Sequence, residues 1–423
     1  MNNFISKAIY KIKTSSLKDG MLFSLFSFIN RGFSFLLLLI LANYIAPAEY
    51  GYLGLFTTVL MVIGFFMAMS TEGYMSVAFF KDGELGVKRT YSFILYLSIL
   101  MALLFGIILL CGGERLSQML ELSRTVLALT VAIAFLTVFV NVNLDYLRLN
   151  EQIKPYGLLS CGNALMNFVL SILLVKYCGF GWIGRVWAQL WCFLLFGVGA
   201  ILFFCRKKMV VKVPYKYCKG ILFWGLPLIP HLAANFFRQG CDRYIVNYYH
   251  TIEAVGLFSF ALNLTNVIVM VGAGFNQSNS VLIYKILGDK EIAGIEKKIK
   301  INEIIKNNIL IYVVLTFFIV GGMDLLVPFL LPKYTGSLVY FNILGMYGLL
   351  QCLYFIYSNF LFFYNKTKEI MYITFCSSLF HLSLSLLLTR YSLLFTCIVY
   401  AISQFVIIYV LRRYSIKILN INI

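Results

Sequence analysis

The residues best able to do chemistry are polar and charged side chains inside one apolar stretch, residues 221–248. Four of them follow one another at spacings of four, three and four residues: His231, Asn235, Arg238 and Asp242. At about 100° per residue these spacings predict one face of an α-helix. Gln239 and Arg243 form a second polar row beside that face. A charged side chain at the centre of a bilayer costs at least about 2.5–3.5 kcal/mol. The pattern therefore favours a helix that faces a water-filled, ligand-holding cavity.

A second interpretation keeps the same helix but gives it no ligand. Arg238 and Asp242 lie four residues apart and could neutralise each other as a polar contact between helices. That interpretation leaves Arg243 unpaired within its own helix, which favours the cavity. Arg243 could instead lie near the outer interface and extend its guanidinium group to water.

Three other apolar stretches of the chain also carry polar stripes. Arg31 lies about nine residues into the first stretch, roughly 14 Å deep at 1.5 Å per residue, which is too deep for easy access to water. Glu72 ends a face of small residues in the second stretch, and Asn263 and Asn266 share a face of the eighth. Stripes of Ser, Asn and Gly alone are typical of helix packing in membranes. The ionised residues therefore carry the functional prediction.

The composition is that of a membrane protein. Of the 423 residues, 61% are hydrophobic and 12% are charged, and the mean hydropathy is +0.87, which excludes a soluble domain of this length. The net charge of +18 is spread in short basic clusters between apolar runs, which argues against nucleic-acid binding. The ten cysteines form no C-x-x-C pair and no zinc spacing, so no metal site is expected. The three histidines are too far apart to suggest one, and we expect packing roles for His250 and His381.

Apolar windows of about 20 residues, bounded by charge, Gly or Pro, predict twelve membrane-spanning helices. They cover residues 22–45, 52–73, 91–111, 125–146, 156–176, 181–204, 221–248, 255–283, 306–331, 338–364, 369–389 and 392–411. With the N-terminus inside, 26 of the 35 Lys and Arg residues fall in cytoplasmic segments and six in outer loops. This positive-inside pattern predicts an all-α polytopic membrane protein with both termini in the cytoplasm.

The middle of the chain predicts how the helices are grouped. The basic segment 205–220 is expected to be a cytoplasmic linker between two six-helix lobes, residues 1–204 and 221–423. The two lobes show a weak internal repeat, because residues 46–52 and 251–257 both predict a short acidic turn that leads through Gly into an aromatic-rich helix. Such repeats, each with its N-terminus inside, would be parallel and related by an axis along the membrane normal.

Several segments resemble the Wzx-type O-antigen flippases and related polysaccharide exporters, which share a superfamily with the lipid II flippases and the MATE drug exporters. The segments are Gly225-Leu226-Pro227-Leu228-Ile229-Pro230-His231, Asp242-Arg243, Glu253-Ala254-Val255-Gly256-Leu257-Phe258-Ser259 and Pro47-Ala48-Glu49-Tyr50-Gly51. The resemblance is densest over residues 221–285 and otherwise follows the twelve-helix layout. It implies a V-shaped pair of lobes around a central cavity lined by helices one, two, seven and eight. It also implies cationic cavity residues, and the matching positions are Arg31, Arg238 and Arg243.

The substrate that the resemblance implies is an undecaprenyl-diphosphate-linked oligosaccharide, such as an O-antigen repeat unit. It would move from the cytoplasmic to the periplasmic leaflet by alternating access. A diphosphate cannot cross hydrocarbon unpaired, and the planar guanidinium group suits phosphate oxygens. We therefore expect Arg31, Arg238 and Arg243 to bind the diphosphate. We expect amide side chains to bind sugar hydroxyls, and two acidic residues to release the arginines or bind a coupling ion: Asn235, Gln239, Asn263 and Asn266, and Asp242 and Glu72.

Neither enzyme activity nor a cofactor is expected, apart from coupling to H⁺ or Na⁺. The sequence contains no G-x-x-x-x-G-K-[ST] phosphate loop, so direct drive by ATP is not expected. The expected partners are the lipid-linked oligosaccharide, membrane lipids, a polysaccharide polymerase and a chain-length regulator, with no nucleic acid. The expected location is the bacterial cytoplasmic (inner) membrane, in lipopolysaccharide biosynthesis and polysaccharide export.

Two other functions remain open from the sequence. A MATE-like cation or drug antiporter would need carboxylates in its cavity, whereas the central helices here carry cations. A membrane-embedded polysaccharide polymerase usually keeps a long periplasmic loop, and the longest outer loop here is about residues 111–124.

Overall fold

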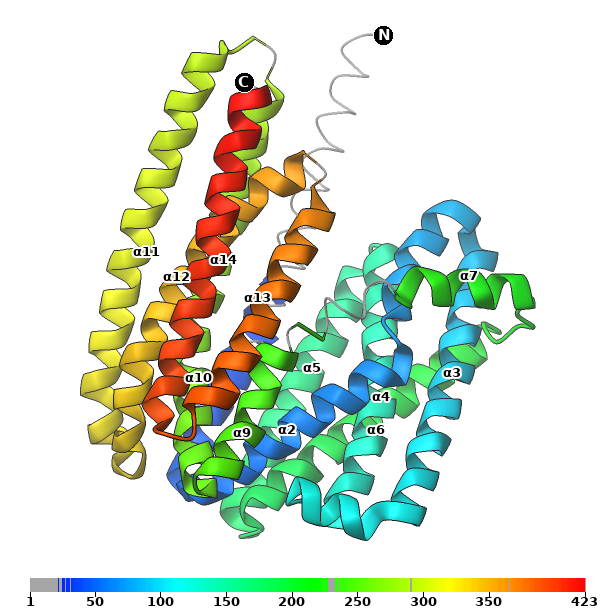
Figure 1. The fold of residues 1–423 in the computed structure, drawn as a ribbon. Coiled ribbons are helices and arrows are strands. Elements are labelled where there is room, and N and C mark those ends of the chain that lie inside the picture. Colours follow the sequence, from blue (N-terminus) through cyan, green and yellow to red (C-terminus); the bar gives the residue numbers. More distant parts are fainter. Residues whose placement is uncertain are drawn as a thin grey trace. The chain divides into compact units, whose positions relative to one another are not determined.

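The structure is a computed structural model that describes residues 22, 25–26, 28–30, 32–226, 233–234, 236–289, 291–364 and 366–422. These residues form helices joined by short turns, and no strand occurs among them (Figure 1). They include ten helices that are long and apolar enough to cross a membrane, and a shorter apolar helix, Phe28–Tyr44. Helices suit a bilayer because each backbone polar group is bonded within its own segment. The prediction of an all-α, multi-pass membrane protein is confirmed.

The chain divides into two compact units, of which unit 1 consists of Met1–Ile45 and Val59–Ile229. Four long helices form its body: α3 (Tyr74–Leu120), α4 (Arg124–Leu149), α5 (Ile153–Ile172) and α6 (Gly181–Arg206). Helix α4 packs against α3 and α6, and α6 also packs against α5. A π-helical turn, η2 (Leu173–Tyr177), extends α5.

The basic segment between the predicted lobes is bound to unit 1. Ser92 of α3 accepts a hydrogen bond from the Val211 amide at 2.8 Å and donates one to the Met209 carbonyl at 3.2 Å. The short helix α7 (Tyr215–Gly225) then packs against α3, where the Tyr217 hydroxyl donates to an Asp82 carboxylate oxygen at 3.2 Å. These contacts fix the segment on α3.

Unit 2 consists of Ala46–Thr58 and Pro230–Ile423. Its helices are α9 (Cys241–Tyr249), α10 (Ile252–Gly288), α11 (Gly294–Leu330), α12 (Leu338–Phe363), α13 (Thr367–Leu388) and α14 (Leu393–Asn422). Helix α12 packs against both α10 and α14, while α11 lies against α12 and α13 lies against α14 (Figure 1). The interior of unit 2 is therefore formed mainly by α10, α12 and α14.

Helix α2 (Pro47–Ala68) is shared between the units, because its residues up to Thr58 belong to unit 2. Three glycines, Gly51, Gly54 and Gly256, bring this part of α2 against α10, and we call them the glycine seam. A Cβ atom at Gly256 would lie 2.6 Å from the carbonyl carbon of Pro47, inside the 3.4–4 Å of ordinary contact. The two segments predicted as equivalent turns, 46–52 and 251–257, therefore touch each other inside unit 2.

Two of the differences between the predicted spans and the observed helices concern the regions 74–91 and 221–248. The cytoplasmic loop expected before residue 91 is helical, because α3 begins at Tyr74 and continues through a kink at Gly83, whose φ is +60°. The single span expected over 221–248 is instead α7, a π-helical turn η4 (Phe236–Gly240) and α9, with residues 227–232 and 235 outside the described part. A π-helix bonds each residue to the fifth one along, so its side chains turn through a smaller angle per residue than in an α-helix.

Candidate functional site

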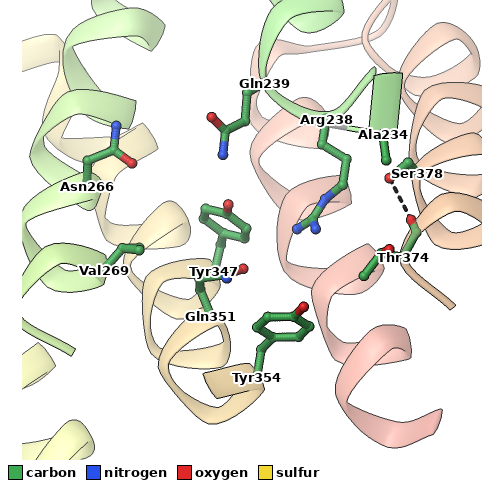
Figure 2. A pocket seen from close by; sticks show the side chains of 10 residues that line it. All are labelled: Ala234, Arg238, Gln239, Asn266, Val269, Tyr347, Gln351, Tyr354, Thr374 and Ser378. Carbon is green, nitrogen blue, oxygen red and sulfur yellow. Dashed lines mark hydrogen bonds between the residues drawn. The ribbon is translucent and has the colours of Figure 1, made fainter. Parts of the chain in front are cut away.

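A cavity of about 220 Å³ lies inside unit 2, between η4, α10, α12 and α13 (Figure 2). At about 30 Å³ per water molecule it has room for roughly seven waters. Its polar walls carry one guanidinium group, three amides and two tyrosines: Arg238, Gln239, Asn266, Gln351, Tyr347 and Tyr354. Thr374 and Ser378 of α13 complete the polar lining. The cavity therefore offers hydrogen bonds, aromatic faces and a positive charge.

Arg238 supplies the charge of this cavity. Its guanidinium group donates to the side-chain oxygen of Gln404 on α14, and its centre lies 5.8 Å from the ring centroid of Tyr347. The Nε atom of Arg238 and the amide nitrogen of Gln404 are buried, and neither has a hydrogen-bond partner among the described residues. Buried donors of this kind normally have partners. In Figure 2 the guanidinium group points into the cavity, toward the two tyrosines.

Arg243 lies outside this cavity lining and in the seam between α2 and α10. Its Nε donates to Ser259 Oγ at 3.2 Å, and its Nη1 donates to Thr58 Oγ1 at 3.2 Å. A third bond, of 3.3 Å, goes from Nη1 to the backbone carbonyl of Gln239. Arg243 is therefore held by neutral oxygens next to the glycine seam.

Within the described part of the chain, neither Arg238 nor Arg243 forms a salt bridge with a carboxylate. Asp242 is fully buried and contacts α13 in place of these arginines. Its Oδ2 lies 2.7 Å from Nε2 of His381. Its Oδ1 accepts a hydrogen bond from Ser385. The interpretation in which Arg238 and Asp242 neutralise each other is therefore wrong. The π-helical turn explains the error, because it changes the angle between these two side chains.

The other expected site residues are distributed over both units. Gln239 and Asn266 line the cavity with Arg238. Asn263 is not part of the lining, because its amide donates to the hydroxyl of Tyr50 at 2.8 Å in the core of unit 2. Glu72 lies in unit 1, half-buried in a 3₁₀ turn, η1 (Thr71–Gly73), with Asp145 as a charged neighbour. Arg31, Asn235 and His231 lie outside the described residues.

Sequence reasoning missed the residues that α12, α13 and α14 contribute. His381 is buried as a packing role requires, and both of its ring nitrogens have polar partners, Asp242 and Ser403. A signal for α13 was present: Thr374, Ser378, His381 and Ser385 follow one another at four, three and four residues, the same spacing as in the stretch 221–248. Tyr347, Gln351 and Tyr354 likewise share one face of α12.

His250 has the structural role expected for it. Its Nε2 lies 2.7 Å from the backbone carbonyl oxygen of Thr389, at the end of α13. A histidine that donates to one of the last carbonyls of a helix satisfies a group that has no partner within that helix.

Known proteins show the same architecture. The solved structure described as "Inward-facing conformation of a multidrug resistance MATE family transporter of the MOP superfamily" has a TM-score of 0.72, covers 94% of this chain and 95% of its own, and is 14% identical. The outward-facing conformation of such a transporter has a TM-score of 0.63 and covers 96% of both chains at 15% identity. These likenesses show the fold.

Sequence relatives extend over most of the chain. The "Lsg locus putative protein 1" of Haemophilus influenzae is 22% identical over 381 residues, which is 88% of this chain and 91% of that protein. An "Uncharacterized membrane protein" of the same organism is 21% identical over 401 residues, or 91% of this chain and 92% of that protein.

Two family models match the sequence. The model of the family described as "Polysaccharide biosynthesis protein" matches residues 40–272, more than half of the chain, and the MatE model matches residues 227–387. Together with the fold, these matches indicate a transporter rather than an enzyme. They also confirm the resemblance to the Wzx-type flippases. The chain belongs to the polysaccharide biosynthesis protein family, within the superfamily that includes the MATE transporters.

Proposed function

We propose that this protein is a flippase for an undecaprenyl-diphosphate-linked oligosaccharide, such as an O-antigen repeat unit. It moves this lipid from the cytoplasmic to the periplasmic leaflet of the bacterial inner membrane by alternating access. The family supports the polysaccharide part of the proposal, and the cavity of unit 2 supports the anionic part. A polysaccharide polymerase and a chain-length regulator then act on the product outside.

The observation that carries the proposal is the state of Arg238. Its positive charge lies at a cavity, it has no carboxylate partner among the described residues, and its Nε has no acceptor there. A guanidinium group binds phosphate oxygens in pairs and keeps its charge at every physiological pH. We assign it to the diphosphate, and the amides and tyrosines of the cavity to the first sugar.

The membrane potential also favours the proposed outward movement of the lipid. An inside-negative potential favours outward movement of an anion by about 2.3 kcal/mol per charge per 100 mV. Coupling to H⁺ or Na⁺, and consumption of the product by the polymerase, would add to this drive. In this proposal Arg243 binds the substrate only when its bonds to Thr58 and Ser259 are exchanged for bonds to phosphate.

The MatE match favours one other candidate, a cation or drug antiporter. A cationic substrate needs a negative or π-rich site. The described lining of the cavity contains a guanidinium group and no carboxylate, so its electrostatic potential opposes a cation. The cavity therefore favours the anionic lipid.

The test is translocation in proteoliposomes that contain a short undecaprenyl-diphosphate-linked oligosaccharide, with the exposed fraction followed by lectin binding. Loss of one charge-assisted hydrogen bond costs about 1.5–3 kcal/mol, so Arg238→Ala should weaken substrate binding roughly ten- to hundredfold at about 1.4 kcal/mol per factor of ten. Arg238→Lys should recover part of this loss.

A matched control removes a second arginine that lies away from the cavity. Arg390 is exposed and, among the residues that the structure describes, donates to the neighbouring Tyr391, so Arg390→Ala should translocate at the wild-type rate. Equal rates for Arg238→Ala, Arg238→Lys and the wild type would refute the role of Arg238. Transport of an organic cation, with no movement of the lipid, would establish the antiporter instead.

A further inference from the structure

The Asp242–His381 pair is a buried acid–base pair that substrate binding in the cavity does not use. Both side chains are fully buried, and Asp242 Oδ2 lies 2.7 Å from His381 Nε2. On the other side of the ring, His381 Nδ1 lies 2.9 Å from Ser403 Oγ, and that hydroxyl lies 3.1 Å from the carbonyl oxygen of Tyr400. Every polar atom of the pair therefore has a partner.

These contacts allow two protonation states. In the first state, Ser403 donates to the Tyr400 carbonyl and accepts a hydrogen bond from Nδ1–H of His381. The pair then holds a second proton, which lies in the short contact between His381 Nε2 and Asp242 Oδ2. In the other state, Ser403 turns its hydrogen to Nδ1, and Nε2–H donates to the Asp242 carboxylate. The pair is neutral overall in the first state and carries one negative charge in the second. Rotation of one hydroxyl satisfies both states, so neither leaves a buried polar atom unpaired.

A row of hydroxyl groups leads from this pair to one end of the bundle. Ser385 donates to Asp242 Oδ1, and its Oγ lies 3.3 Å from Thr389 Oγ1, which lies 2.8 Å from Thr396 Oγ1. Hydroxyl groups both donate and accept, so they can pass a proton along such a row. The row ends at the turn between α13 and α14, where Tyr391 is 64% exposed. The orientation predicted from the basic residues puts this turn on the periplasmic side.

The pair is also adjacent to the arginines of the proposed substrate site. Consecutive residues of α14 contact the two centres, because Ser403 binds His381 and Gln404 binds Arg238. Arg243 follows Asp242 in the chain and interacts with its charge. The other titratable groups that face Asp242 or His381 are Cys241 on α9, and Cys397 and Tyr400 on α14. The rings of Tyr400 and His381 meet edge to face, with their centroids 4.7 Å apart.

We propose that Asp242 and His381 together form a proton-binding site whose loading promotes anion binding in the cavity. The proton reaches it through the hydroxyl groups of Ser385 and Thr389. Without the proton, the negative charge of the pair attracts the neighbouring arginines and opposes an incoming anion; with it, this charge is neutralised. A proton suits the site better than a metal ion, because no third His, Cys, Asp or Glu joins the pair among the described residues. The choice of anion rests on the proposed function, whereas the proton site does not.

The first experiment needs no substrate. Infrared difference spectra of the purified protein, recorded over a pH titration, should show carboxylate and imidazole bands that are absent in Asp242→Asn. Asparagine keeps the shape of the site and can still donate to His381 and accept from Ser385, so this variant should fold. Identical difference spectra for the wild type and Asp242→Asn would overturn the proton site, whatever the substrate is.

The second experiment measures the coupling. A short-chain prenyl diphosphate linked to one sugar is titrated into the protein by calorimetry, in two buffers of different ionisation enthalpy. We expect uptake of up to one proton per bound probe, and tighter binding at lower pH by about five- to 150-fold. Asp242→Asn should bind tightly at every pH, and His381→Gln weakly at every pH, both without proton uptake.

The outcomes separate the two proposals. Binding without proton uptake, or binding that depends on Na⁺ in place of pH, would overturn the coupling but not the flippase. Absence of probe binding would reject the proposed substrate, and the infrared result would still decide the proton site.

A third experiment tests the route of the proton. Thr389→Val should slow proton uptake in stopped-flow measurements, while Thr130→Val, which removes an equally buried hydroxyl from α4, should not. Equal rates for both would refute the hydroxyl row.

Discussion

The substitution Gly256→Ala tests the packing of α2 on α10. A Cβ atom at this position would lie 2.6 Å from the Pro47 carbonyl carbon and 3.0 Å from the amide nitrogen of Gly51, where ordinary contacts are 3.4–4 Å. These are backbone atoms, and the Pro47 carbonyl oxygen lies closer still. No side chain can turn aside, so the helices must separate. Overpacking of this kind costs about 1–3 kcal/mol.

The same movement stretches two hydrogen bonds that join α2 to the rest of unit 2. They are the 2.8 Å bond from Asn263 to Tyr50 and the 3.2 Å bond from Arg243 to Thr58. At about 0.5–1.5 kcal/mol each, their loss brings the expected destabilisation of Gly256→Ala to roughly 2–6 kcal/mol. Thermal unfolding in detergent, followed by circular dichroism, measures this change as a lower Tm.

The control is a Gly→Ala substitution at another position of α10. A Cβ atom at Gly274 would have no neighbour within 4 Å, so Gly274→Ala should be neutral or should stabilise α10 by up to about 1 kcal/mol. Gly256→Ala should therefore lower Tm, whereas Gly274→Ala should leave Tm unchanged or raise it. If Gly256→Ala unfolds at or above the wild-type temperature, the close approach of α2 to α10 described above is refuted.

Two further substitutions test individual contacts. Tyr50→Phe leaves the Asn263 amide without its acceptor and should lower the free energy of unfolding by about 1–3 kcal/mol, which chemical denaturation would measure. The double variant with Asn263→Leu should recover much of this loss. An unchanged denaturation midpoint for Tyr50→Phe would contradict the hydrogen bond between Asn263 and Tyr50. Burial raises the pKa of Tyr217 above its usual value of 10, so the docking of α7 on α3 should be intact below pH 10 and weaken as the pH rises through the higher folded-state pKa. Hydrogen exchange of α7 amides should show this alkaline loosening in the wild type and not in Tyr217→Phe, and the same alkaline change in both would contradict the role of Tyr217.

Much of the helix layout follows from the apolar windows. The windows 125–146, 181–204 and 338–364 agree to within a few residues with α4 (Arg124–Leu149), α6 (Gly181–Arg206) and α12 (Leu338–Phe363). The reason is that the bilayer thickness sets the length of a span and charged residues set its ends. The long helix α3 was missed at its start because Lys81, Lys88 and Arg89 end an apolar window without ending a helix.

The site could be predicted less well than the fold. The spacing in the stretch 221–248 puts Arg238 and Gln239 on neighbouring rows of one helix, and both residues line the cavity. The same spacing, however, assumes a regular α-helix. The π-helical turn departs from that regular helix, and the Asp242 side chain beyond it binds His381. Nothing in the spacing of one helix reveals a partner that is 139 residues away in the chain. The stripe on α13 would have revealed both His381 and Ser385 had it been paired with the first one.

The sharing of α2 between two compact units has a mechanical consequence. The boundary between them falls between Thr58 and Val59, inside one continuous helix, so the backbone hydrogen bonds of α2 run across it. Thr58 also accepts one of the three hydrogen bonds that Arg243 donates. A ligand that draws the Arg243 guanidinium group away from Thr58 would therefore remove a side-chain constraint on α2 one residue before this boundary.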